Sequence, residues 1–280
     1  MLISLTTDFG DRDGYVGIMK GVMAAIAPGV TFVDLSHAIP PQDLRSAAYV
    51  LWTALPYFPP ESVHLVVVDP GVGTSRKPIA ARTAWGTLVG PDNGVFSYVW
   101  EVAPPTMVVE LCNPRYRRAE VCATFHGRDI FSPAAAHLAR GVPLEDFGPP
   151  VAEPVRLPLP ILRVHDNALH GEVLYADHFG NLITSIGRLA WESAPRRGAQ
   201  LRFTAAFGAA PELLLPSAHS EVFVAGRSLG PVRRTYGEVA PGEALALVGS
   251  EGLLEIAISH GNAAANLGLP LGAPVTVQLS

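Results

Sequence analysis

The 280-residue sequence has few charged residues, few cysteines and no long apolar run. Charged residues make up 16% of it, against roughly 25% in average soluble proteins. Gly, Pro, Asp or Arg interrupts every apolar stretch before the roughly 18 residues that a membrane-spanning helix needs. The sequence therefore predicts no membrane span. The low charge predicts that apolar surface is buried between the subunits of a homo-oligomer.

Other absences exclude further classes of protein. The two cysteines, Cys112 and Cys122, are too few for a disulfide framework and lack metal-ligand spacing. The net charge of −5 argues against nucleic acid as a partner. The first residues lack the basic start and the cleavage site of a signal peptide, which predicts a cytoplasmic location. Gly71-Val72-Gly73 lacks the third glycine and the Lys-Ser/Thr of the nucleotide-binding loops.

Predicted strands and helices alternate in the first half of the chain. Apolar patterns predict strands at 2–5, 30–35 and 63–68, and helices at 15–26 and 44–55. A pair of strands at 79–83 and 87–89, a strand at 106–111 and an alanine-rich helix through Arg140 follow. This alternation indicates an α/β domain at 1–150, with a central, mostly parallel sheet flanked by helices.

The second half has a different pattern. Six prolines between 143 and 160 indicate an extended connector, which we place at 151–165. Short alternating stretches separated by Gly, Asn and Pro occupy 166–280. They predict a smaller all-β domain, a barrel or a sandwich, and we favour a barrel-like one.

An acid and an arginine flank the turn after the third predicted strand. Asp69 follows the buried run at 63–68, Pro70, Gly71 and Gly73 turn the backbone, and Arg76 returns within reach of Asp69. Open α/β sheets bind their ligands at the carboxyl ends of such strands. The alternative is an ordinary turn with a surface ion pair.

His126 completes a possible catalytic group with Asp69 and Arg76. A histidine held by a carboxylate can take a proton from water near neutral pH, while the arginine orients the acid. A hydrogen-bonded structural histidine is the alternative. Four loops could bring such residues to one sheet edge: 8–13, 69–76, 92–94 and 126–129. We predict no metal site, because the sequence has no His-x-x-x-His or Cys-x-x-Cys pair.

The segment 177–181 of the second domain could recognise a purine. It interrupts a strand pattern with an acid, an aromatic ring and an amide, in Asp177, Phe179 and Asn181. The ring could stack on a base and the amide could read the edge of the base. Gly-Asn is also common in ordinary turns.

Six short motifs in this order resemble those of the S-adenosyl-L-methionine (SAM) hydroxide adenosyltransferases, relatives of the fluorinase and chlorinase enzymes. The likeness extends over almost the whole chain. The motifs are Thr7-Asp8-Phe9-Gly10 with Asp13, Asp69-Pro70-Gly71-Val72-Gly73 with Arg76, Pro91-Asp92-Asn93-Gly94, Phe125-His126-Gly127-Arg128-Asp129, Asp177-His178-Phe179-Gly180-Asn181 and Gly261-Asn262-Ala263.

The resemblance implies hydrolysis of SAM to adenosine and methionine, by attack of water or hydroxide on the ribose C5′, without metal or cofactor. It further implies trimers with active sites between the first domain of one subunit and the second domain of its neighbour. The implied catalytic residues are Asp69, Arg76 and His126. The implied substrate contacts are Asp8 to the ribose diol, Asp13 and Asp177 to the methionine ammonium, Phe179, Asn181 and Tyr236 to adenine, Ser250 to the methionine end, and Asn93.

Two alternatives remain at this stage. The first is a nucleophilic halogenase; by the same resemblance, halogenases carry tyrosine in place of Asp69 and His126, threonine in place of Val72 and tryptophan in place of Gln42. A carboxylate beside the nucleophile would repel a halide, which disfavours halogenation. The second is a non-catalytic sensor of SAM or adenosine, which Asp8, Phe179 and Asn181 would serve equally well.

Overall fold

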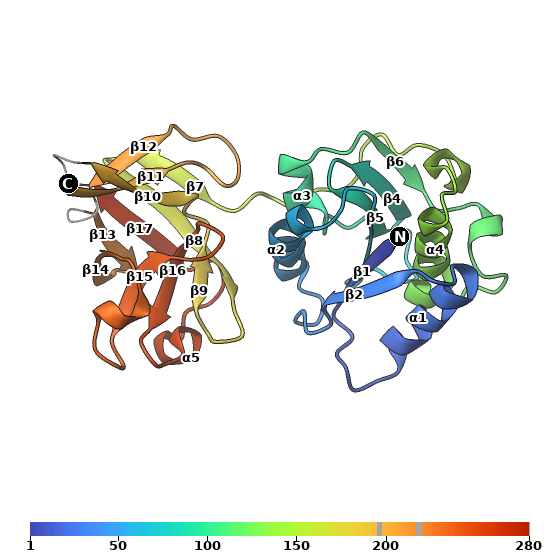
Figure 1. The fold of residues 1–280 in the computed structure, drawn as a ribbon, viewed down its shortest axis with the longest axis horizontal. Coiled ribbons are helices and arrows are strands. Elements are labelled where there is room, and N and C mark those ends of the chain that lie inside the picture. The colour runs from blue at the N-terminus through green and yellow to red at the C-terminus, as the bar shows by residue number, and fades with distance from the viewer. Residues whose placement is uncertain (195–197, 217–219, 280) are drawn as a thin grey trace. The chain divides into compact units, whose positions relative to one another are not determined.

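The computed structural model describes residues 1–194, 198–216 and 220–279. The chain forms two compact units, Met1–Pro158 (unit 1) and Leu159–Ser280 (unit 2). Figure 1 shows both units with their helices and strands labelled. The boundary between the units falls within the proline-rich segment of the sequence.

Unit 1 is an α/β domain built on a six-stranded sheet of order β2-β1-β3-β5-β4-β6. Strands β2, β1, β3 and β5 run parallel, while β4 is antiparallel to β5 and β6. The predicted fold class is therefore confirmed. The elements are β1 (Leu2–Thr7), α1 (Tyr15–Ile26), β2 (Thr31–Ser36), α2 (Leu44–Ala54), β3 (Val63–Val67), β4 (Pro78–Thr83), β5 (Gly86–Pro91), α3 (Ser97–Val102), β6 (Met107–Glu110) and α4 (Ser132–Ala139).

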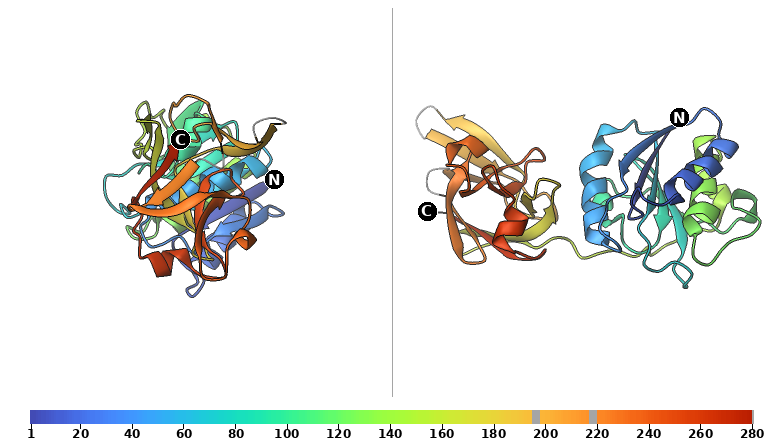
Figure 2. Two further views of the ribbon diagram at one scale, coloured as in Figure 1. Left: turned by 90° about the vertical axis from the view of Figure 1, so that its left-hand side faces the viewer. Right: turned by 90° about the horizontal axis from the view of Figure 1, so that it is seen from below.

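Side chains from both faces of the sheet enter apolar cores. Leu65 and Val67 of β3 pack in the core that contains Met19 of α1 and Ala135 of α4. Val66, between them, points to the opposite core, where α2 and α3 lie. Figure 2 shows α1 and α4 on one side of this sheet and α2 on the other. A strand buried on both faces explains why residues 63–68 are continuously apolar.

Two details of unit 1 differ from the pattern-based prediction. The helix through Arg140 begins with a π-helical turn, Gly127–Phe131, that continues into α4. Helix α3 was not predicted, because its six residues are too few to display helical periodicity. The predicted strand pair with its turn at Trp85-Gly86 is present as β4 and β5.

Unit 2 is a β-barrel. Its strands follow the order β17-β13-β14-β15-β16-β9-β8, and a pairing between β17 and β8 closes the ring. Strand β7 extends the sheet beyond β8, and β10, β11 and β12 form a separate sheet. The elements are β7 (Leu162–His165), β8 (Ala168–Ala176), β9 (Leu182–Thr184), β10 (Leu189–Ala194), β11 (Gly198–Phe203), β12 (Leu213–Pro216), β13 (Ser220–Val224), β14 (Arg227–Arg233), β15 (Ala244–Val248), β16 (Leu254–Ile258), α5 (Ala263–Leu267) and β17 (Pro274–Leu279).

Several elements of unit 2 were missed at the sequence level: β7, β10, β12, β14 and α5. Strand β14 contains Gly230 with a φ of 74° and then Pro231, so its sequence has the composition of a turn. No helix among the described residues is long and apolar enough to cross a membrane.

The buried His64 of β3 generates a prediction about stability. Its Nδ1 lies 2.7 Å from Ser4 Oγ and its Nε2 lies 2.9 Å from the Trp85 carbonyl. Burial lowers the pKa of His64 to about 4 from 6.5. Between these values the unfolded chain carries the extra proton, so the free energy of unfolding should fall as the pH falls from about 6.5 to about 4, by up to ~3 kcal/mol.

Urea unfolding of the protein and of His64→Gln across this pH range would measure the effect. Glutamine can still donate to the Trp85 carbonyl but does not titrate, so its pH slope should be smaller. Equal slopes would show that His64 does not contribute.

Candidate functional site

Asp69 and Arg76, on the loop after β3, form a buried ion pair. Arg76 Nε donates to Asp69 Oδ1 at 3.0 Å, and Arg76 Nη2 donates to Asp69 Oδ2. The two side chains are only 5–6% exposed, so the alternative of a surface ion pair is wrong. The Arg76 guanidinium also lies 5.3 Å from the centre of the Phe131 ring. Both oxygens of the carboxylate are thereby fixed at the carboxyl end of β3.

His126 joins this pair through the arginine. Its Nδ1 lies 2.9 Å from Arg76 Nη2. A guanidinium can only donate, so Nδ1 accepts and the ring proton of neutral His126 is on Nε2. The prediction of a histidine held by a carboxylate is therefore corrected: Arg76 holds the ring. Burial, and then the charge of Arg76, lower the pKa of His126 below 6.5, which keeps the ring neutral at neutral pH.

Asp129 fixes the loop that carries His126. It is fully buried and accepts hydrogen bonds from Arg128 Nε at 2.7 Å and from the Cys122 amide at 2.9 Å. Arg118 adds an ion pair at 3.2 Å. Burial raises the pKa of Asp129, but these partners lower it more. Asp129 thus stays ionised and ties the two ends of the loop together.

Two glycines let this loop approach the rest of the site. Gly73 has a φ of 78°, and a Cβ there would lie 2.6 Å from the Ala123 carbonyl oxygen. A Cβ on Gly127 would lie 3.2 Å from the Met19 sulfur. The loops at 69–76 and 122–127 therefore pack backbone to backbone, and His126 is brought beside Arg76.

Asp69 and His126 open onto a pocket of about 420 Å³ within unit 1. Asp8 lines the same pocket, and its Oδ2 accepts a hydrogen bond from the backbone amide of Gln42 at 2.9 Å. The structure thus brings together three of the predicted residues around one cavity. The pocket is lined by Asp8, Phe9, Tyr15, Pro41, Gln42, Val67, Asp69, Pro70, Val72, Thr124, Phe125, His126 and Gly127.

Two other predicted contacts in unit 1 do not line this pocket. The side chain of Asn93 donates to the Val68 carbonyl at 3.0 Å and accepts the Val95 amide at 3.2 Å, so it supports the end of β3. Asp13 is exposed just before α1.

Two of the predicted residues of unit 2, Asp177 and Tyr236, lie near a buried glutamate, Glu255. Asp177 accepts both the backbone and the side-chain amide of Asn181, at 2.8 and 3.0 Å, and Phe179 between them is 73% exposed. Tyr236 donates to Glu255 at 2.5 Å. The turn that carries Ser250 also approaches Glu255, since a Cβ on Gly249 would lie 2.8 Å from Glu255 Oε2.

Glu255 was not among the predicted site residues. It lies on β16, is 7% exposed, and has a pKa raised by burial and by the charge of Asp177, against the hydrogen bond from Tyr236. Burial and the bond to Glu255 in turn raise the pKa of Tyr236. The sequence does contain a signal for Glu255: it is the one acid in the apolar run 253–258, and an acid that is buried needs a partner.

The aromatic rings of the unit 1 pocket were also missed. In the helix predicted at 15–26, the apolar spacing places Tyr15 on one face with Met19 and Met23. Both methionines are buried, but Tyr15 is 47% exposed and lines the pocket with Phe9 and Phe125. A period of 3.6 cannot separate a residue facing the core from one at the rim of a cavity.

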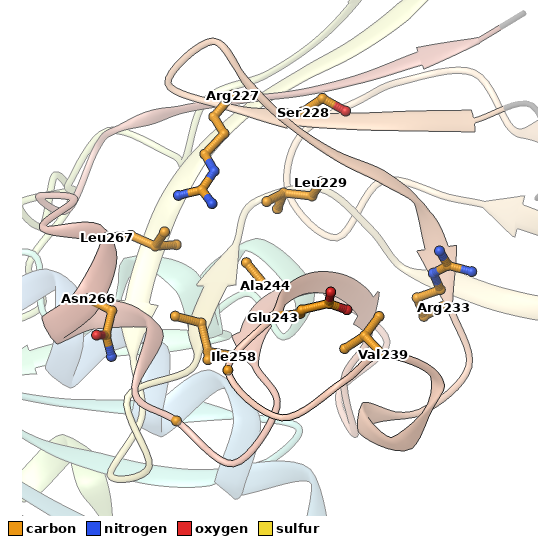
Figure 3. Close-up of a pocket in the computed structure, with 12 residues that line it drawn as sticks. Arg227, Ser228, Leu229, Arg233, Val239, Glu243, Ala244, Ile258, Asn266 and Leu267 are labelled. Carbon is orange, nitrogen blue, oxygen red and sulfur yellow. The ribbon is translucent and has the colours of Figure 1, made fainter.

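Unit 2 contains a larger hollow, of about 600 Å³, that none of the predicted site residues lines. Figure 3 shows the guanidinium of Arg227 pointing into it, with Leu229, Ala244 and Ile258 among the apolar walls. Within the described parts of the chain, no three His, Cys, Asp or Glu side chains are grouped to hold a metal ion.

The chain thus consists of an α/β unit with a buried ion pair and a histidine at the end of β3, and of a β-barrel unit. Comparisons with known proteins give the family. Residues 3–148 match the SAM hydroxide adenosyltransferase N-terminal domain, and residues 171–276 match the C-terminal domain. The chain belongs to the SAM hydroxide adenosyltransferase family.

Its relatives include proteins named (R)-S-adenosyl-L-methionine hydrolase. The chain is 47% identical to that of Thermus thermophilus, with 96% of each chain covered, and 44% identical to that of Salinispora tropica, with 96% and 95% covered. A fluorinase of Actinopolyspora mzabensis is more distant, at 28% identity over 100% of this chain and 97% of the other. The crystal structure of an uncharacterized conserved protein from Thermotoga maritima matches with a TM-score of 0.84, at 33% identity, covering 99% and 100% of the chains.

Proposed function

We propose that the protein hydrolyses SAM to adenosine and L-methionine by attack of water at C5′ of the ribose. One observation favours hydrolysis over halogenation. The four residues expected to differ in halogenases are Gln42, Asp69, Val72 and His126, and all four line the same pocket. The residues that would choose the nucleophile therefore surround one cavity, and here they supply a carboxylate and a neutral imidazole. The proteins named as hydrolases are also closer in sequence than the fluorinases.

The connected side chains define how water would be held. Asp69 can accept a proton from water, while the Nε2–H of neutral His126 can donate to the water oxygen. Arg76 fixes both partners, since it contacts each of them. A carboxylate is a weak base at neutral pH, so proton transfer accompanies the formation of the C–O bond. Positioning therefore contributes more than deprotonation alone.

The reaction is balanced without a further reactant. A bond forms between the water oxygen and C5′ as the bond from C5′ to sulfur breaks, and sulfur keeps the electron pair. The sulfonium leaves as the neutral thioether of methionine. The proton from water passes to Asp69 and then to solvent. We therefore also propose that the reaction uses no cofactor and no metal.

The remaining site residues would bind the two ends of the substrate. Asp8 would bind the ribose diol, the ring and amide at 177–181 would bind adenine with Tyr236, and Asp13, Asp177 and Ser250 would bind the methionine end. Support comes from the place of Asp8 in the unit 1 pocket, and from the hydrogen bond that joins Asp177 to Asn181 in unit 2. We further propose a trimer in which unit 1 of one subunit and unit 2 of its neighbour form each site. The cytoplasmic location remains a prediction.

Chromatography of the products from labelled SAM, with chloride present, tests the reaction directly. Adenosine and methionine should appear in equal amounts. A 5′-chlorinated nucleoside would indicate a halogenase, and intact SAM with tight binding would indicate a sensor.

In the same assay, Asp69→Asn and His126→Ala should each lower turnover by roughly 10²-fold or more, because each removes one of the two groups that hold water. Calorimetry should show little change in SAM affinity for His126→Ala and a weaker affinity for Asp69→Asn, which also removes one of the two negative charges that line the pocket. Asp146→Asn, an exposed acid outside the pocket, is the matched control and should retain full turnover. A loss below tenfold at both site positions would indicate structural roles.

The lowered pKa of His126 predicts the acid limit of activity. The neutral ring accepts from Arg76 and donates to water; the protonated ring cannot accept. Turnover should therefore persist as the pH falls through 6.5 and decline only below that value. The dependence of kcat/KM on pH would show this limb, and an acid limb above pH 7 would contradict the assignment.

A further inference from the structure

Three aromatic rings in the lining of the unit 1 pocket pack on one another in inclined or edge-to-face contact. The rings of Phe9 and Phe125 lie 6.1 Å apart at 72°, those of Tyr15 and Phe125 lie 5.2 Å apart at 82°, and those of Phe9 and Tyr15 lie 5.6 Å apart at 57°. All three residues line the cavity that Asp69 and His126 enter. We refer to Phe9, Tyr15 and Phe125 as the aromatic box.

The aromatic box has the properties of a cation site. Aromatic faces attract cations, and most strongly where the cation loses water on entering a hollow. One ring already makes such a contact, since the Arg128 guanidinium carbon lies 5.1 Å from the centre of Phe125. Tyr15 is 47% exposed, so a large part of its ring is open to a ligand. The carboxylates of Asp8 and Asp69 line the same cavity and add attraction for positive charge.

The chain order places the aromatic box beside the reacting carbon. Phe9 follows Asp8 directly, and Phe125 precedes His126. In SAM the sulfonium sulfur is bonded to C5′, so a C5′ that faces Asp69 and His126 brings the sulfur within one bond of them. Of the three rings, that of Phe125 belongs to the residue that directly precedes His126 in the chain. No other part of the substrate carries a methylated, weakly hydrated cation.

We propose that the aromatic box binds the methylsulfonium of SAM and makes the protein select the charged substrate over its neutral thioether analogues. This proposal deepens the proposed hydrolysis and rests on it. The sulfonium charge decreases as the C5′–S bond breaks, so the rings bind the substrate more strongly than the transition state. The aromatic box therefore sets affinity and selectivity rather than the rate of the bond-breaking step.

The test compares the binding of SAM with that of S-adenosylhomocysteine, which lacks the methyl group and the charge. Calorimetry would use the full-length protein carrying Asp69→Asn, so that SAM persists, with and without Tyr15→Leu. Leucine keeps apolar bulk but has no aromatic face. Tyr15→Leu should weaken SAM binding by about 3- to 30-fold and change S-adenosylhomocysteine binding by less than about twofold. A protonated nitrogen isostere of SAM should behave like SAM.

Two variants and one kinetic readout separate this role from a structural one. Tyr15→Phe keeps the ring and should restore the selectivity. Tyr57→Leu replaces a tyrosine that is 78% exposed and does not line the pocket, and should leave the selectivity unchanged. With Asp69 present, Tyr15→Leu should raise KM for SAM without lowering kcat.

Equal weakening of both ligands by Tyr15→Leu would overturn the proposal, because the ring would then contact the shared part of the molecule. Unchanged affinity for both ligands would also overturn it and would assign charge recognition to the carboxylates. Failure of hydrolysis in the wild-type protein, with selectivity that depends on Tyr15, would refute the proposed function and leave this inference standing. Hydrolysis without selectivity that depends on Tyr15 would support the proposed function and refute this inference.

Discussion

The buried pairing of Asp69 with Arg76 is the interaction on which the rest of the site depends. Removing two charges from water costs several kcal/mol per ion, and good geometry with further hydrogen bonds is needed to offset that cost. Here the guanidinium meets both carboxylate oxygens and the imidazole of His126. Loss of one member of such a pair leaves the other charge uncompensated, at about 3–5 kcal/mol. One arginine thus fixes the geometry of both groups that face the pocket.

Much of this arrangement follows from local sequence. The apolar run at 63–68 predicts a strand buried on both faces, and an acid followed by Pro and Gly predicts its end and its turn. The alternation of strands and helices then implies that such ends meet at one edge of a parallel sheet. The convergence of Asp8, Asp69 and His126 on one cavity agrees with that reasoning.

What could not be predicted depends on tertiary contacts. The bond from Arg76 to His126 joins residues 50 positions apart, so a carboxylate was an equally reasonable partner before the loop at 122–127 was placed. Glu255 could be recognised as a candidate site residue only from the structure, in which the barrel places Tyr236 and Asp177 near it. Tyr15 has the spacing of a core residue but lies at the rim of a cavity. Short or glycine-containing elements such as α3 and β14 give too little periodicity to be recognised.

The formal charges around the pocket explain why this site suits water. Asp8 and Asp69 each carry −1, Arg76 carries +1, and His126 is neutral, so the group is negative by one charge and complements a sulfonium. In the proposed hydrolysis the positive charge would disappear from sulfur while a proton arrives on Asp69, and the total charge within the cavity would not change. A halide would instead bring a third anion beside two carboxylates, at a cost that grows as water is excluded. In the proposed mechanism, the carboxylate of Asp69 therefore has two effects: it accepts a proton from water and it repels a competing halide.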